Sequence, residues 1–306
     1  MRETSIQHIH IDSLAELHKF LGLPEPRHPL FTILRFKDFP KLALESKVKL
    51  SADFYQITFK KDYEGNKMIY GQSEYDFNEG VLSFFAPKQV FIKEGELTPP
   101  SGFVIMIHPD YLHGYPLDDK IKSYGFFEYA VNESLILSEE EELLIENIFT
   151  QIKEESIRPI DTHSQDVIIS NLELLLSYSN RFYTRQFITR KPQYNTLLSK
   201  FERYLDELLQ DKSLLENGLP GVATIAEKFN LTPKYFSDLI KQHSGRSTQQ
   251  HIHEKLIERA KEKLSGTSFS VSEIAYQLGF EHSQSFNKLF KSKTNLSPLE
   301  FRSLFN

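Results

Sequence analysis

Apolar residues change their spacing along the chain, and the change separates a predicted β region from predicted helices. From Phe31 to about Tyr129 apolar and polar positions tend to alternate, as in strands with one buried face. Turn-forming Pro, Gly and Asn residues separate six candidate strands, at 31–36, 54–60, 67–70, 81–85, 89–92 and 102–107. Many short strands predict an all-β barrel or sandwich.

Helical spacing takes over after residue 135. Ser138 is a candidate N-cap with Glu141 three residues later, a capping box, and apolar residues continue from there to Ile152. The helix that follows Pro159 carries more apolar surface than one packed side requires. We therefore predict a dimer interface, with packing against the chain's own β region as the alternative. The residues predicted in the dimer contact are Ile168, Leu172 and Leu175.

Residues 181–192, R-F-Y-T-R-Q-F-I-T-R-K-P, predict a solvated linker, and 194–210 predict a helix beyond it. The segment 274–302 then predicts two helices joined by a tight turn. Gly279 ends the first of them and supplies the positive φ of a sharp reversal, with Phe280 as a plug between the helices. The second has apolar residues at i, i+3 and i+4, namely Phe286, Leu289 and Phe290.

The same pattern occurs about fifty residues earlier. Ile225-Ala226 matches Ile274-Ala275 at an offset of 49, and Phe236 matches Phe286 at an offset of 50. The intervening segment 248–264 predicts one continuous helix of roughly 25 Å at 1.5 Å per residue. A rigid spacer of that length suits two recognition helices about one DNA turn, roughly 34 Å, apart. The duplicated helix-turn-helix units are predicted at about 222–243 and 271–293.

These motifs resemble the DNA-binding domain of the AraC/XylS family of bacterial transcription regulators. The resemblance rests on A-x-x-L-G-F at 275–280, S-F-N-K-L-F-K at 285–291 and S-P-L-E-F-R at 297–302. Asn295 stands where the family usually has Gly, and Asn is the next best residue for a left-handed cap. Asp238 stands where relatives often carry a basic or polar residue, which predicts a weaker phosphate contact for the first unit.

The resemblance implies an α+β protein in three parts. Residues 1–135 would form a cupin-like, effector-sensing β-barrel or jelly roll, 136–190 a helical dimerisation and linker segment, and 191–306 the DNA-binding domain. The partners implied are double-stranded promoter DNA, RNA polymerase, a small effector and a second copy of the chain. No enzymatic activity and no cofactor are predicted.

The polar faces of the two recognition helices contain the predicted DNA contacts. Gln and Asn can bond adenine bidentately, whereas Lys contacts phosphate or guanine. On the second helix the candidates are Ser283, Gln284, Asn287, Lys288 and Lys291. On the first they are Lys234, Tyr235, Ser237, Asp238 and Lys241, with Asp238 as an acceptor for cytosine N4.

Charge is distributed unevenly, which matters because the net charge of −6 by itself argues against binding DNA. Residues 221–306 contain 12 Lys and Arg against 8 Asp and Glu, a net charge of +4, which leaves −10 for the remainder. An acidic body with a basic end predicts moderate, salt-dependent affinity for DNA. The absence of Cys excludes disulfides and thiolate zinc sites, and it agrees with a cytoplasmic location. No signal peptide or membrane span is predicted.

Aromatic residues of the β region are the effector candidates, with ordinary core as the alternative. They are Phe54, Tyr55, Phe84 and Phe103. No metal site is predicted, because His8, His10 and His18 lack an acidic partner at suitable spacing, and His108 and His113 flank a turn.

The function predicted from the sequence is sequence-specific DNA binding by an effector-responsive transcription regulator. A cupin-type enzyme with a DNA-binding tail and a DNA-binding protein with an inert barrel are the alternatives. The sequence does not separate an activator from a repressor.

Overall fold

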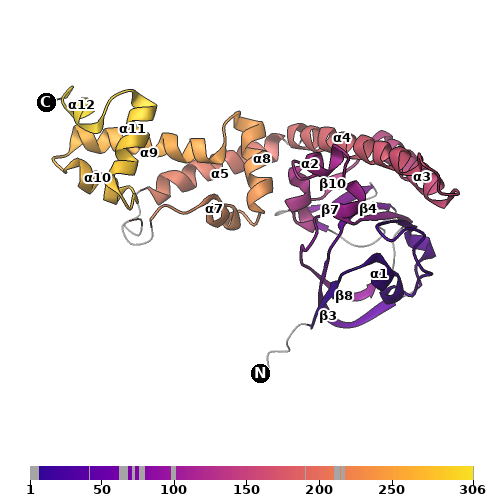
Figure 1. The fold of residues 1–306 in the computed structure, drawn as a ribbon. Helices are drawn as coiled ribbons and strands as arrows, with labels where there is room; N and C mark the ends of the chain where they lie inside the picture. Colours follow the sequence, from indigo (N-terminus) through magenta and orange to yellow (C-terminus); the bar gives the residue numbers. More distant parts are fainter. Residues whose placement is uncertain are drawn as a thin grey trace. The chain divides into compact units, whose positions relative to one another are not determined.

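The computed structural model describes residues 7–40, 42–61, 68–70, 73–75, 80–97, 101–189, 191–209, 214 and 218–305 (Figure 1). The chain forms two compact units, Met1–Gln186 and Phe187–Asn306. The first mixes strands with helices, and the described part of the second is helical, which confirms the predicted α+β class with a helical C-terminal domain. None of the described helices has the length and apolar character needed to cross a membrane.

The described strands of the first unit form three sheets. The largest has the order β10-β7-β4-β9-β2, with β2 at Phe31–Arg35, β4 at Tyr55–Lys61, β7 at Val81–Phe85, β9 at Ser101–Ile107 and β10 at Leu135–Ile136. The second has the order β1-β3-β8, with β1 at Gln7–Ile11, β3 at Leu42–Ala52 and β8 at Phe91–Leu97. A hairpin pairs β5, Met68–Tyr70, with β6, Ser73–Tyr75. Lys67, the first residue of one predicted strand, lies outside the described residues, and barrel closure stays a prediction.

Helices cover the larger sheet. Those of the first unit are α1 at Leu14–Phe20, α2 at Leu117–Ile121, α3 at Glu139–Ile157 and α4 at Ser164–Thr189, with short 3-10 turns at Phe36–Asp38, Pro109–Leu112, Gly125–Glu128 and Val131–Glu133. Phe149 of α3 stacks on Phe59 and on Phe103, each at 5.6 Å between ring centroids. Val104, the next residue of β9, packs in a cluster with Leu14 of α1. Alternate residues of β9 therefore serve two cores, as the two-residue period of a strand requires.

The predicted capping box at the start of α3 is confirmed. Ser138 Oγ accepts a hydrogen bond from the backbone of Glu141, and the Glu141 carboxylate accepts one from the backbone of Ser138 at 2.9 Å. The Glu141 carboxylate also forms an ion pair with Arg185 of α4. Arg185 donates a further hydrogen bond to the Ile136 carbonyl at 2.8 Å. One glutamate thereby starts α3 and holds it to α4.

The dimer contact predicted for α4 is wrong in its residues. Ile168, Leu172 and Leu175 are 5%, 0% and 0% exposed in the single chain, so they pack inside it. The exposed large apolar residues of this helix are instead Val167 and Leu174, two turns apart, and Ile188 near its end. The sequence showed that α4 is apolar on more than one face, but it did not show which face the chain covers.

The linker prediction also fails for most of its length, because α4 continues to Thr189. Tyr183 stacks on Phe126 with ring centroids 5.4 Å apart and meets Tyr129 edge-on. Phe182 is buried as well. The aromatic and basic residues from 181 to 189 are therefore parts of a helix.

The second unit contains two helix-turn-helix pairs and the helix that connects them. Its helices are α5 at Lys191–Leu208, α7 at Val222–Lys228, α8 at Pro233–Ser244, α9 at Thr248–Gly266, α10 at Val271–Gln277, α11 at Ser283–Thr294 and α12 at Pro298–Arg302. Ile274, Phe286 and Phe290 form one buried cluster with Leu256 of α9. In the first pair the ring of Phe236 meets that of Phe201 from α5, with 5.3 Å between the ring centroids. The predicted repeat and its helical spacer are confirmed.

Left-handed residues occupy equivalent turns in the two pairs. Asn230 has φ 55° between α7 and α8, and Gly279 has φ 81° between α10 and α11. After the recognition helices, Gly245 has φ 72° and Asn295 has φ 62°. Gly and Asn thus exchange places between the pairs, because both adopt the left-handed conformation at little cost. The prediction that Asn295 caps its helix is confirmed.

Candidate nucleic-acid interface

The exposed face of α11 is a continuous polar stripe. Gln284, Asn287, Lys288 and Lys291 are all exposed and recur at i, i+3, i+4 and i+7, so they share one face of the helix. In the part of the chain that the structure describes, none of their side chains has a hydrogen-bond or ion-pair partner. Ser283 is half-buried at the start of the helix. This stripe presents two amides and two cations to solvent.

Aromatic packing fixes the opposite face of α11. Phe286 and Phe290 are 1% and 0% exposed. Phe280, which follows the turn, meets Phe286 at 5.5 Å between ring centroids, as its predicted role as a plug requires. The backbone N–H of Phe280 donates to the Ala275 carbonyl at 3.1 Å. A rigid back and a free polar front are the two properties that a groove-reading helix needs.

The equivalent stripe on α8 is partly neutralised. Lys234, Ser237, Asp238 and Lys241 take the positions of the four α11 residues at an offset of 50. The Lys234 ammonium lies 3.2 Å from the Asp238 carboxylate, an ion pair one helical turn apart. Lys241 is exposed. Because one cation already has a carboxylate partner, α8 offers less net positive charge than α11.

The prediction of a DNA contact for Tyr235 is wrong. Its side chain is 1% exposed, and its ring meets Phe187 at 5.3 Å. Tyr235 is the counterpart of Ser285 and lies about 100° around the helix from Lys234, beside the buried Phe236. The hydroxyl expected at the groove is therefore inside the protein.

Comparison with known proteins identifies relatives of this helical domain. Residues 225–303 match the model of a helix-turn-helix domain family. The transcriptional activator RhaS of Salmonella arizonae is 35% identical over 78 residues, which cover 26% of this chain and 28% of that protein. Over this segment the resemblance to the AraC/XylS family of transcription regulators is confirmed. The chain thus matches little more than a quarter of the length of this activator.

Two solved structures are also similar to a part of this chain. The C-terminal domain of the response regulator AraT from Geobacillus stearothermophilus is 26% identical, with 35% of this chain and 84% of that one covered and a TM-score of 0.31. The DNA-binding domain of AdpA, solved with a target DNA, is 19% identical, with 35% and 91% covered and a TM-score of 0.31.

The aromatic residues predicted to bind an effector lie in the packed core of the first unit. Phe54, Tyr55, Phe84 and Phe103 are all buried. The Phe84 ring meets Phe127 at 5.4 Å, and so does the Tyr55 ring at 5.1 Å. Burial raises the pKa of the Tyr55 phenol. The charges of Lys122, which lowers this pKa, and Asp118, which raises it, have smaller effects. Ordinary core packing accounts for these four residues.

The reason given for excluding a histidine metal site is wrong. His10 Nε2 lies 3.1 Å from the Asp12 carboxylate and 3.3 Å from that of Asp53, which the fold brings from beyond β3. Ser51 Oγ hydrogen-bonds to both His8 and His10, at 2.8 and 2.7 Å. Within the described residues, His10, Asp12 and Asp53 thus form a group of three side chains that could hold a metal ion. Asp12 follows His10 by two residues in the sequence, whereas the approach of Asp53 depends on the pairing of β1 with β3.

Proposed function

We propose that the chain is a sequence-specific DNA-binding transcription regulator in which the second helix-turn-helix unit contributes most of the affinity. The unpartnered stripe of Gln284, Asn287, Lys288 and Lys291 carries this proposal. Its lysines can neutralise phosphates and release counterions, and its amides match the donor and acceptor pattern of adenine. The first helix-turn-helix pair, α7 and α8, adds a weaker contact, because Asp238 already neutralises Lys234.

The length of the connecting helix α9 supports simultaneous DNA binding by both helix-turn-helix pairs. A helix of the length of α9, Thr248–Gly266, spans roughly 28 Å at 1.5 Å per residue. Successive major-groove windows on one face of DNA are roughly 34 Å apart. In the proposal α8 and α11 enter neighbouring windows, with α9 along the duplex.

The finer organisation is part of the proposal. Residues 1–135 sense a small effector in a cupin-like fold, 136–190 contain dimer contacts and 191–306 bind promoter DNA and act on RNA polymerase. The exposed Val167 and Leu174 of α4 supply apolar surface for a dimer contact. The protein works in the cytoplasm and has no enzymatic activity.

A matched set of variants tests the base contacts. A preferred sequence is first selected from a random DNA pool, and affinities are then measured by fluorescence anisotropy on this site and on a scrambled duplex. Gln284→Ala should cost about 1–3 kcal/mol on the selected site and little on the scrambled one. Lys288→Ala should weaken both and lower the salt slope by about 1.

Lys293 provides the control for charge. It lies on α11 about 180° from Gln284, on the side of His253, whose pKa is lowered by burial and by the Lys293 charge. Lys293→Ala removes the same charge as Lys288→Ala and should leave the salt slope nearly unchanged. Equal losses for both lysine variants, or a Gln284→Ala loss that does not depend on sequence, would contradict the assignment.

A further inference from the structure

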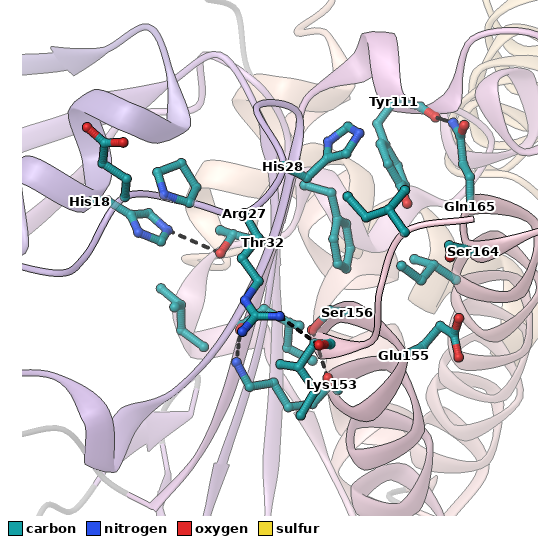
Figure 2. Close-up of a pocket in the computed structure, with 18 of the residues that line it drawn as sticks. His18, Arg27, His28, Thr32, Tyr111, Lys153, Glu155, Ser156, Ser164 and Gln165 are labelled. Atoms are coloured by element: carbon teal, nitrogen blue, oxygen red, sulfur yellow. Dashed lines mark hydrogen bonds between the residues drawn. The ribbon is translucent and has the colours of Figure 1, made fainter. Parts of the chain in front are cut away.

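A cavity of about 590 Å³ opens in the first unit, away from the aromatic core that was predicted to bind an effector (Figure 2). Residues of the loop after α1, of β2, of the end of α3 and of the start of α4 line it. Its volume lies within the range of roughly 300–1,000 Å³ typical of small-molecule sites. The connection between α3 and α4 forms one side, so a bound molecule would contact sheet and helices together.

Apolar side chains form much of the wall. Phe31 stacks on Tyr111 with ring centroids 5.1 Å apart. Ile157 and Ile160 also line the cavity, although they are 49% and 71% exposed. Apolar surface left open around a concave site is surface that an apolar ligand would cover.

Two cations face this wall without carboxylate partners. Lys153 Nζ donates to the Ile33 carbonyl at 2.9 Å, and Arg27 donates to the Ile157 carbonyl at 2.6 Å. Among the described residues neither forms an ion pair. Burial lowers the pKa of Lys153, the nearby Arg35 and Arg27 lower it further, and Asp38 opposes them. The half-buried ammonium of Lys153 is thus a charge that an anion would stabilise.

The carboxylates nearest the helices are already engaged. Glu155 forms an ion pair with Arg158 at 3.1 Å. Asp161 accepts hydrogen bonds from the backbone of His163 at 2.8 Å and from Ser164 Oγ at 3.1 Å. Glu25 and Asp38, both exposed, also border the cavity. Because these two carboxylates would repel a second negative charge, a monoanion suits the site better than a dianion.

The cavity lining also includes His28, whose ring is held in one orientation. His28 Nδ1 accepts a hydrogen bond from the backbone of Leu30 at 3.1 Å, so the proton of the neutral ring is on Nε2. Burial lowers the pKa of His28, which favours that neutral form. His18 is hydrogen-bonded to Thr32 and to the Pro24 carbonyl, and these bonds hold the loop after α1 in place. The cavity is therefore preformed on this side.

We propose that this cavity is the effector site, and that it binds a small organic monocarboxylate whose charged group meets Lys153 and Arg27 while its apolar body packs on Phe31, Ile157 and Ile160. The proposal rests on the proposed regulatory function, to which it adds the place and chemical class of the effector. A carboxylate here would receive charge-assisted hydrogen bonds from two cations, and such bonds are roughly twice as strong as bonds between neutral groups.

The test compares acids with alcohols of the same carbon skeleton. Hexanoate, octanoate and 4-phenylbutyrate are titrated into the full-length protein by calorimetry, each beside the corresponding alcohol. At least one acid should bind saturably and at least about tenfold more tightly than its alcohol, in proportion to the charge-assisted bonds it gains. Equal binding of acid and alcohol, or no saturable binding by any acid, overturns the proposal.

Two variants locate the site. Lys153→Met should weaken acid binding roughly tenfold or more, and Ile160→Glu should weaken it by repelling the anion from the rim. Lys49→Met, at an exposed position on β3, is the matched control and should bind like the unmodified protein. Unchanged unfolding temperatures confirm that the variants are folded. Binding that is insensitive to both cavity substitutions overturns the assignment.

DNA binding is measured separately, so the two proposals can fail independently. Acid binding without any preferred DNA sequence would reject the regulatory function and leave the cavity assignment standing as a ligand site. Sequence-specific DNA binding without acid binding would reject the cavity assignment alone.

Discussion

Gly279→Asn tests the turn that sets the angle between α10 and α11. Asn is natural at the equivalent Asn230, so the left-handed backbone itself costs little. A Cβ at residue 279, however, would lie 3.1 Å from the Leu219 backbone nitrogen and 3.2 Å from Leu219 Cγ. Contacts this short require neighbouring atoms to move, and overpacking of this kind costs about 1–3 kcal/mol.

Gly245→Asn is the matched control. It introduces the same side chain at another left-handed glycine, where a Cβ would meet nothing within 4 Å. Asn295 already occupies the equivalent turn of the second pair. The control should therefore cost only a few tenths of a kcal/mol, the usual difference between Gly and Asn at such positions.

Hydrogen exchange of the full-length protein, measured by mass spectrometry, reports the local stability of each pair. A loss of about 2 kcal/mol should speed exchange of the peptides over α10 and α11 by roughly thirtyfold. Peptides over α7 and α8 should be unchanged. The reasoning fails if Gly279→Asn and Gly245→Asn have equal effects, or if protection over α10 and α11 survives intact.

Three further predictions concern the core, assembly and pH. Phe286→Ala should cost about 3–5 kcal/mol and abolish specific DNA binding, whereas the exposed Leu299→Ala should do neither; anisotropy and hydrogen exchange measure both. Leu174→Glu should convert a dimer to a monomer by light scattering, and an unchanged mass would reject that contact. Because burial lowers the pKa of Lys153, the unfolded chain binds more protons between the folded pKa and about 10.5. The unfolding free energy should rise with pH across this window, and Lys153→Met should flatten that rise.

The helical domain was largely predictable from the sequence because its signals are local. The spacing of Phe286 and Phe290, the turn at Gly279 and the cap at Asn295 each depend on neighbours within a few residues. The repeat of the pattern made the interpretation specific, and the structure confirms both helix-turn-helix pairs.

The errors arose where distant segments decide the outcome. Tyr235 looks like an exposed polar residue until Phe187 packs against its ring. Ile168 and Leu172 lie on a helix whose apolar residues cover more than one face, and only the fold selects the buried one. The same limit applies to Asp53, which reaches His10 through the pairing of β1 with β3.

The cavity was missed for a related reason. Lys153 and Arg27 are more than a hundred residues apart, and each looks like an ordinary surface cation in the sequence. Their role depends on the carbonyls to which they donate and on the absence of ion pairs in the described structure. Composition drew attention to the aromatic β region instead, where the rings fill the core.

The continuity of α9 has a consequence for the DNA that this domain can read. Because α9 is one uninterrupted helix, the recognition helices α8 and α11 cannot rotate independently of each other to follow a displaced half-site. One additional base pair between the two half-sites would rotate one of them by roughly a tenth of a turn, since B-form DNA repeats about every ten base pairs. Under the proposed function, DNA sites bound by this chain should therefore conserve the length of the segment between their two motifs more strictly than its base sequence.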